Sequence, residues 1–382
     1  MAANRSEARS FLSIGTLAAY DAVGYALVPP ILPALRERAN ASALAASLIF
    51  AAFSIGMFGG FLIAGLVIVR RGPREVAVGG ALLHLAGDLL FIFGHSAGLY
   101  TVARIVQGLG SGLVWMAAVF AVLMLWPERP ESRLARILTG FALGSVVGPL
   151  LAALGGPIRP FVADACLAAA GMTAAVRFPS GRTRSFGWHP GTLRNRLLGF
   201  ALVVIMLVAL VFSVLDGSYT LHFATRLSQT GLAVLFTAAT LAYGLGAMLP
   251  GSRSLRARKV NAQLGLACSA VLLLGIASFD SVAWWFALSI LLGAALGAAE
   301  ASVLSIASSM AEGGLITAMV AYSQAFALGF VIGPPVATWL TTRFSLVVSA
   351  VAVGVVLVLG ACSGLLVPIR QPGPPERSPE PS

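Results

Sequence analysis

Hydrophobic residues run in twelve long segments separated by short polar stretches, a pattern typical of membrane-spanning helices. About 20 consecutive apolar residues cross a hydrocarbon core of ~30 Å as a helix, and each segment is close to that length. A backbone in lipid must satisfy its own hydrogen bonds, so we predict an all-α integral membrane protein. The predicted spans are residues 11–34, 43–69, 76–94, 98–125, 134–156, 159–177, 197–218, 230–250, 260–279, 282–307, 314–340 and 344–368.

Two segments of the chain are near copies of each other. Residues 141–152 read FALGSVVGPLLA and residues 326–337, which lie 185 positions further on, read FALGFVIGPPVA. The same offset carries the starts of the first six predicted spans close to the starts of the last six. Such repeated halves are typical of secondary transporters. We therefore predict two pseudo-symmetric six-helix halves at residues 1–177 and 197–368, a cytoplasmic linker loop at 178–196 and a disordered cytoplasmic tail at 369–382.

The composition excludes a soluble protein. Hydrophobic residues make up 58% of the chain and charged residues only 10%, whereas a soluble domain is about a quarter charged. The net charge of +11 does not indicate nucleic-acid binding, because the basic residues gather on alternate loops. The less basic set of loops holds only Arg36, Arg38, Arg159, Arg226 and Arg343. The basic side is therefore expected to be cytoplasmic, with both termini on it and in contact with anionic lipid.

Three motifs resemble those of a known family. In the fifth span a glycine recurs at every fourth position and a proline follows: Gly140, Gly144, Gly148 and Pro149. Residues 104–110 read R-x-x-Q-G-x-G in the fourth span, and Asp21 precedes VPPILP at 28–33 in the first. These motifs resemble the major facilitator superfamily, and within it the twelve-span drug:proton antiporters and the vesicular amine transporters. The resemblance implies a fold in which two halves rock about a site at the middle of the membrane.

The loop after the second span resembles the family's gating motif with one departure. Residues 65–74 read GLVIVRRGPR and are similar to G-x3-D-R-x-G-R-R, but Val69 stands where the family has its aspartate. Small residues let helices approach closely, and a proline removes a backbone hydrogen bond and can kink a helix. We expect conformational roles for Gly65, Arg70, Gly72, Arg74, Gly140, Gly144, Gly148, Pro149, Gly333 and Pro334.

An acid near the middle of the first span is the first candidate for chemistry. A charge at mid-bilayer costs at least about 2.5 kcal/mol by insertion scales, so ionisable residues there are functional candidates. Asp21 lies near the middle of its span, with Tyr25 one turn further on the same face. One interpretation is an acid that releases a proton when a cationic substrate binds. The alternative is a static ion pair, and we favour proton coupling and substrate binding at Asp21.

Four polar and aromatic residues line one face of the fourth span, and they are Arg104, Gln107, Ser111 and Trp115. The family resemblance places Arg104 near the first-span acid, where a permanently charged guanidinium would bias the charge state of Asp21. The alternative is a fixed tie between helices. Trp115 is a candidate aromatic wall for a flat or cationic ligand, or else a packing residue. Gln107 and Ser111 are candidate substrate ligands.

Other intramembrane polar residues are distributed over both halves. Glu300 in the tenth span is a candidate second proton-coupling acid and substrate ligand, and Gln324 is a candidate hydrogen-bonding ligand. Asp216 is a candidate substrate ligand, although it and Asp164 lie near the outer ends of their spans, where an interfacial position is expected. In the third span His84 and Asp88 are four residues apart. We interpret these two as a structural pair.

The sequence favours a transporter over an enzyme. No polar segment is large enough for a soluble enzyme domain, and we expect no metal site and no cofactor. No phosphate-binding G-x4-G-K-[ST] motif is present, so the expected energy source is a proton gradient. We predict a monomeric exporter of a small amphiphilic compound, either cationic or neutral, in a bacterial cytoplasmic membrane. Two alternatives remain open: uptake of a sugar, amino acid or other metabolite, and a non-transporting sensor or assembly partner.

Overall fold

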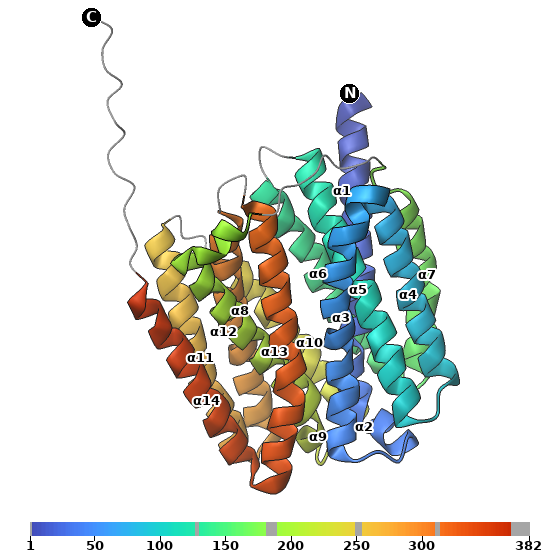
Figure 1. Cartoon of the computed structure of the whole chain (residues 1–382). Helices are drawn as coiled ribbons and strands as arrows, with labels where there is room; N and C mark the ends of the chain where they lie inside the picture. Colours follow the sequence, from blue (N-terminus) through green and yellow to red (C-terminus); the bar gives the residue numbers. More distant parts are fainter. Residues whose placement is uncertain (1, 127–129, 181–188, 249–253, 310–313, 368–382) are drawn as a thin grey trace, which may run out of the picture.

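The computed structural model describes residues 2–126, 130–180, 189–248, 254–309 and 314–367. Within these ranges the chain is almost wholly helical and has no strand. The long helices run side by side as one elongated bundle (Figure 1). This is the all-α architecture that the apolar segments predict. The middle of the predicted linker loop and the predicted tail lie outside the described residues.

The helices of the first half follow one another along the chain with short connections. They are α1 (Ala2–Ala26), α2 (Val28–Arg38), α3 (Ala43–Arg71), α4 (Pro73–Phe93), α5 (Ala97–Leu125), α6 (Pro130–Ala152) and α7 (Arg159–Val176). The second half contains η1 (Pro190–Arg194), α8 (Arg196–Val214), η2 (Leu215–Tyr219), α9 (Thr220–Phe223), α10 (Gln229–Met248), α11 (Leu255–Ser278), α12 (Val282–Ser308), α13 (Leu315–Arg343), α14 (Leu346–Ser363) and η3 (Gly364–Leu366).

The helices match the predicted spans in order and position. Among the described residues, nine helices are long and apolar enough to cross a membrane, and ten if the bent pair of α1 and α2 counts as one span. The remaining two predicted spans correspond to α6, with a shorter apolar stretch at Gly140–Ala152, and to α7. Many leucine, isoleucine and valine side chains on the outside of the bundle are exposed, as expected for a surface that faces lipid.

Two spans depart from a regular α-helix. The first bends by 41° between α1 and α2, where Leu27 separates the helices and Pro29 and Pro30 open the second one. A proline lacks the amide hydrogen, so it is tolerated in a first helical turn and interrupts a longer helix. The seventh span contains a π-helical turn, η2, which carries Asp216. Such turns re-aim side chains and are frequent at functional sites.

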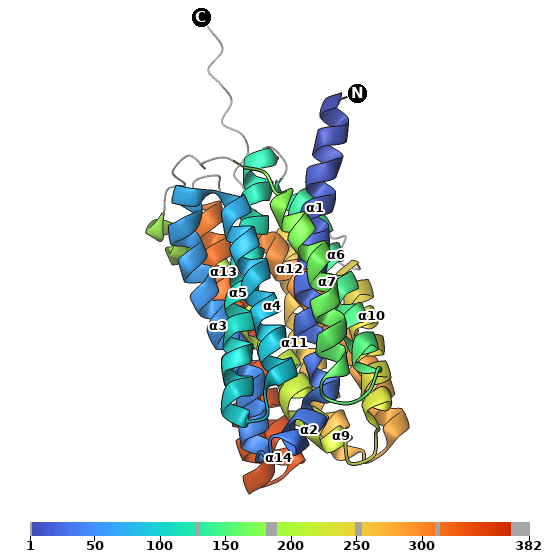
Figure 2. The same cartoon turned by 90° about the vertical axis from the view of Figure 1, so that its right-hand side faces the viewer.

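Helix contacts repeat between the two halves. The α1–α6, α3–α5 and α4–α7 contacts of the first half recur as α8–α13, α10–α12 and α11–α14 in the second. The halves meet along α3–α13 and α6–α10, and α2 also contacts η2, α9 and α10. In Figure 1, α2 and α9 lie at the end of the bundle opposite the start of α1. Seen from the side in Figure 2, α1 stands between α6 and α7.

The repeated glycine-proline segments lie at close helix contacts. A Cβ added at Gly140, Gly144 or Gly148 of α6 would collide with the backbone of α1, and one added at Gly333 of α13 would collide with Ser213 of α8. Only a glycine lets two backbones approach this closely. The sequence repeat therefore marks the packing of α6 on α1 and of α13 on α8.

Candidate functional site

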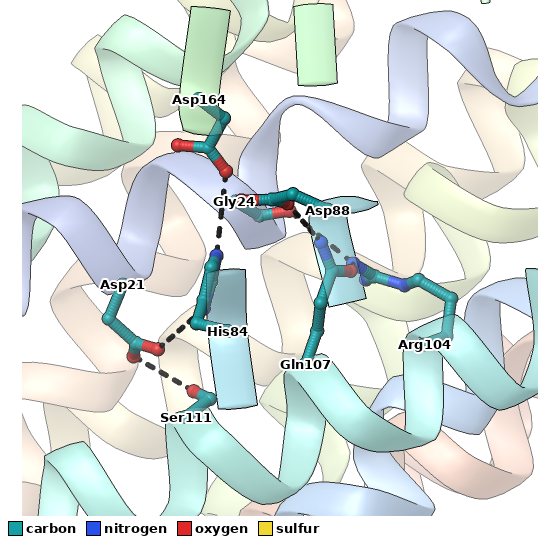
Figure 3. A network of polar contacts seen from close by, with 8 residues as sticks. All are labelled: Asp21, Gly24, His84, Asp88, Arg104, Gln107, Ser111 and Asp164. Carbon is teal, nitrogen blue, oxygen red and sulfur yellow. Dashed lines mark hydrogen bonds and ion pairs between the residues drawn. The ribbon is translucent and has the colours of Figure 1, made fainter. Parts of the chain in front are cut away.

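Asp21 is buried at the centre of the first half and has two polar neighbours (Figure 3). Ser111 of α5 donates a hydrogen bond of 2.8 Å from Oγ to Asp21 Oδ2. On its other side, His84 Nδ1 of α4 lies 3.5 Å from Asp21 Oδ1. Two residues that were predicted separately, Asp21 and Ser111, are thus brought together, and a histidine that was assigned a structural role joins them.

His84 bridges two carboxylates. Its second nitrogen, Nε2, lies 3.5 Å from Asp164 Oδ2 of α7, and the histidine and Asp164 side chains are 1% and 0% exposed. The interfacial position expected for Asp164 is therefore wrong, because the rotation of α7 aims this side chain into the bundle. The imidazole faces α1 and α7 instead of forming the hydrogen-bonded pair with Asp88 that their spacing suggested.

A second chain of hydrogen bonds runs beside the first (Figure 3). Arg104 Nη1 donates to Gln107 Oε1 at 2.9 Å, and Gln107 Nε2 donates to Asp88 Oδ1 at 2.6 Å. Arg104 Nη1 also approaches the backbone carbonyl of Gly24 at 3.3 Å, and its guanidinium lies 4.3 Å from the ring centre of Phe53. The hydrogen bonds of Arg104 therefore go to Gln107 and the α1 backbone, and Gln107 in turn contacts the carboxylate of Asp88.

Glycines make room for this cluster. A Cβ on Gly24 would overlap the His84 ring and lie 2.8 Å from Asp164 Oδ2. A Cβ on Gly87 would overlap Gln107, and one on Gly171 would overlap the Tyr20 ring. The Tyr20 ring packs against the imidazole at a tilt of 52°, with ring centres 4.9 Å apart. The glycines of α1, α4 and α7 thus leave the space that the side chains of His84, Gln107 and Tyr20 occupy.

The cluster keeps unused hydrogen-bonding capacity although it is buried. Atoms without a hydrogen-bond partner include Asp21 Oδ1, both His84 nitrogens, Asp88 Oδ2, both Asp164 oxygens, Arg104 Nε and Nη2, and the Tyr20 hydroxyl. Buried polar groups are nearly always hydrogen-bonded, so such a concentration calls for a functional explanation. Embedded groups of this kind are able to bind and release protons or cations.

His84, Asp88 and Asp164 are the described residues that stand close enough to share a metal ion. Their ligand atoms lie within 4.8 Å of one another. The sequence did not predict this grouping, because the residues come from α4 and α7. Within this group His84 Nε2 and Asp164 Oδ2 lie 3.5 Å apart, an arrangement that also fits an ion pair between the two side chains.

Tyr25 and Asp216 connect the two halves. The Tyr25 hydroxyl donates a hydrogen bond of 2.9 Å to Asp216 Oδ2, from α1 across to η2. Asp216 is buried, so the interfacial position expected for it is wrong. The π-helical turn of η2 places its carboxylate against the first half. Phe53 and Phe330 lie beside the Tyr25 ring, with ring centres 5.4 and 5.5 Å away.

Trp115 and Gln324 also reach across the halves. Trp115 Nε1 donates to Ser323 Oγ of α13 at 3.1 Å, and Gln324 Nε2 approaches the Phe58 carbonyl of α3 at 3.3 Å. Further along, Gln229 Nε2 donates to the Ala152 carbonyl at 2.8 Å. The hydrogen bonds that join the halves among the described residues thus lie at mid-height or toward the end opposite the start of α1.

Glu300 forms a separate acidic centre in the second half. It is buried in α12, and the phenol groups of Tyr243 from α10 and Tyr322 from α13 face its carboxyl group. The Tyr243 ring packs edge-on against Phe212, with ring centres 5.0 Å apart. Glu300 therefore lies among aromatic side chains of the second half, where the Asp21 cluster has no member.

The predicted gating loop connects α3 and α4. Gly72 has a φ of 97°, a conformation that favours glycine, and it ends α3 where Pro73 begins α4. Arg74 Nε donates to the Phe178 carbonyl at 2.9 Å, which ties this loop to the end of α7. Arg70 is exposed, and Gly65 has open space around its α-carbon. The Val69 side chain lies outside the described residues.

A family model and a solved structure match most of this chain, and individual relatives match part of its sequence. The family model described as Major Facilitator Superfamily matches residues 14–185 and 197–382. A protein named multidrug resistance protein MdtL from Klebsiella pneumoniae (strain 342) is 29% identical over 122 residues. The MdtL protein of Escherichia coli O45:K1 (strain S88 / ExPEC) is 30% identical over 122 residues. Each match spans 31% of this chain and 31% of the relative.

Among solved structures, the human organic anion transporter MFSD10 (TETRAN) has a similar fold. The TM-score is 0.75, and the match covers 94% of this chain and 99% of that chain. At 17% sequence identity the likeness concerns the fold alone.

Proposed function

Because the chain belongs to the major facilitator superfamily and is a multi-pass membrane transporter, we propose that it exports a small amphiphilic compound in exchange for protons. The observation that carries this proposal is the buried cluster around Asp21. An acid in the membrane interior is costly unless it has a role. Asp21 joins Ser111 and His84 in a cluster that also keeps unused hydrogen-bonding capacity. Such an acid suits a transporter that binds and releases protons in each cycle.

The substrate in this proposal is an aromatic or cationic amphiphile. Half-buried aromatic side chains lie in both halves, and they are Tyr25, Trp115, Phe212, Tyr243 and Phe326. Tyr25 and Trp115 reach across the interface of the halves by hydrogen bonds. Aromatic faces attract cations and flat apolar groups. Glu300 and Asp216 add carboxylates to the second half of this region. The partial similarity to multidrug resistance proteins supports the same substrate class.

Transport would proceed by rocking of the halves. The contacts α3–α13 and α6–α10 run along the interface, while the hydrogen bonds Tyr25–Asp216 and Trp115–Ser323 cross it. These hydrogen bonds would break when the two halves rock apart to change the side of the membrane to which the site is open. The bacterial relatives support a place in the cytoplasmic membrane. We propose a monomer that uses the proton gradient, with both termini in the cytoplasm.

The direct test replaces Asp21 by Asn in proteoliposomes. Aromatic cations and neutral amphiphiles, beginning with ethidium, are first screened by thermal stabilisation of the purified protein. With an acidic vesicle interior, the wild-type protein should accumulate the selected compound. Asp21→Asn should reduce this accumulation more than tenfold while the protein remains folded, because an amide cannot carry the exchanged proton. Asp280→Asn is the matched control, since Asp280 is an exposed acid paired with Arg226.

Wild-type accumulation by Asp21→Asn would refute the role of Asp21. If no compound in the screen binds to or is moved by the wild-type protein, the export proposal fails. The alternative of a non-transporting membrane protein would then gain support.

A further inference from the structure

We propose that His84 is a proton store for Asp21, an extension that rests on the proposed proton antiport. In this proposal, the imidazolium ring held between Asp21 and Asp164 donates its Nδ1 proton to Asp21 and takes it back during the transport cycle. The ring lies behind Asp21, away from the interface of the halves. Asp21 and Ser111 themselves are one turn from Tyr25 and Trp115, the residues that cross this interface.

The two contacts of the ring favour its protonated form. Nδ1 faces Asp21 Oδ1 and Nε2 faces Asp164 Oδ2, each at 3.5 Å. A neutral imidazole has a hydrogen on one nitrogen and a lone pair on the other, so one of the two carboxylates would face a lone pair. An imidazolium carries a hydrogen on both nitrogens. It therefore matches both neighbours at once.

The charge of the enclosed cluster leads to the same conclusion. Three carboxylates, Asp21, Asp88 and Asp164, are opposed by one permanent cation, Arg104. With a neutral ring these groups would sum to a charge of −2, which is costly in a site that water does not reach. A proton on His84 reduces the imbalance. The side chains that face the ring or this cluster come from every adjoining helix: Tyr20 and Asp21 from α1, Asp88 from α4, Arg104, Gln107 and Ser111 from α5, and Asp164 from α7.

The proposed step is a single proton transfer. The Nδ1–H bond of the His84 imidazolium breaks and an O–H bond forms at Asp21 Oδ1. The ring becomes neutral and keeps its other proton on Nε2, opposite Asp164 Oδ2. The reverse transfer restores the imidazolium and the Asp21 carboxylate. The ring atoms start 3.5 Å from the acceptor, so a small shift of α4 against α1 closes the hydrogen bond.

Nitrogen NMR of the full chain tests the protonation state without any substrate. The chain has four histidines, and the spectrum of His84→Gln identifies the His84 signals in protein labelled with 15N-histidine. At pH 7 in lipid nanodiscs, His84 should carry hydrogens on both nitrogens in the wild-type protein. In Asp164→Asn, which removes one of the facing charges, it should carry one. A His84 ring with one hydrogen in the wild-type protein at pH 7 would overturn the proposal.

Transport of ethidium in proteoliposomes tests whether His84 acts as a proton store for Asp21. His84→Gln should retain exchange of ethidium between the two sides, which needs no net proton movement. It should lose at least 90% of the accumulation driven by an acidic interior. His95→Gln is the matched control, because His95 is exposed and contacts only Arg38 among the described hydrogen bonds. A purely structural role for His84 would reduce exchange and accumulation together.

Three results would contradict the proposal. The first is full accumulation by His84→Gln, and the second is parallel loss of exchange and accumulation in a folded protein. The third is tight binding of Zn²⁺ that His84→Gln abolishes, which would make the cluster a metal site. If the wild-type protein itself fails to accumulate ethidium in response to a pH gradient, proton antiport of this probe fails. The NMR result then decides the state of His84 by itself.

Discussion

At the scale of single residues, the polar cluster of the first half is expensive for the fold. A buried polar group without a partner costs about 1–3 kcal/mol, and the cluster contains several such atoms on Asp21, His84, Asp88, Arg104 and Asp164. Apolar side chains of similar volume would give a more stable bundle. These residues therefore lower the stability of the bundle, and we propose that they serve proton transfer.

Gly24 offers a test at this scale. Gly24→Ala should place a methyl group in the space of the His84 ring and close to Asp164 Oδ2. We expect a loss of about 1–3 kcal/mol of stability from overpacking, together with weaker accumulation of ethidium driven by an acidic interior. Thermal unfolding in detergent measures the first effect. Gly79→Ala is the control, because its Cβ would meet nothing within 4 Å. Equal melting temperatures for the two variants would contradict this account.

At the scale of elements, the apolar segments predicted the helices well but not the direction of their side chains. Runs of about 20 apolar residues are sufficient to identify a span. The sequence placed Asp216 near the outer end of its span, and the π-helical turn of η2 turns the carboxylate inward to meet Tyr25. Asp164 was likewise expected at the membrane–water interface, because it lies near the outer end of its span. Its burial depends on how α7 rotates against α1 and α4, and that rotation is not encoded in segment length or polarity.

The hydrogen bond between Tyr25 and Asp216 provides the test for the elements α1 and η2. Tyr25→Phe removes the donor and Asp216→Ala removes the acceptor, so each should destabilise the observed arrangement, and the double variant should be little worse than either single one. Because a hydrogen bond to a carboxylate contributes about 1.5–3 kcal/mol, the coupling free energy should fall in that range. Thermal unfolding of the four proteins gives this value. Simple additivity would show that the bond does not hold the halves together.

At the scale of the whole molecule, the scaffold is repeated and the chemistry is not. The helix contacts of the first half recur in the second at an offset of 185 residues. At that offset the positions of Asp21, His84, Arg104 and Asp164 correspond to neutral residues in the second half, and these are Met206, Ser269, Ser289 and Ser349. The proposed proton site therefore belongs to the first half, while Glu300 and Asp216 belong to the second.

Part of the fold and of the candidate site could be predicted from the sequence. The spans, a close helix contact along the glycine stripe of α6 and the choice of Asp21, Arg104 and Gln107 as candidates follow from apolar runs, glycine spacing and polar residues in apolar surroundings. The bridge from Asp21 through His84 to Asp164 does not, because it joins α1, α4 and α7 through helix rotation. The spacing of His84 and Asp88 was a visible signal. It indicated that α4 has a polar face without indicating which helices that face contacts.

The most direct test of proton antiport is the sign of the pH change inside vesicles when substrate enters. Wild-type protein is reconstituted with the pH indicator pyranine trapped inside, no pH gradient is imposed, and ethidium is added outside. Because each entering substrate should exchange for protons that leave, the interior should become more alkaline, and Asp21→Asn should abolish the change. Acidification of the interior, or ethidium entry without any pH change, would contradict the account.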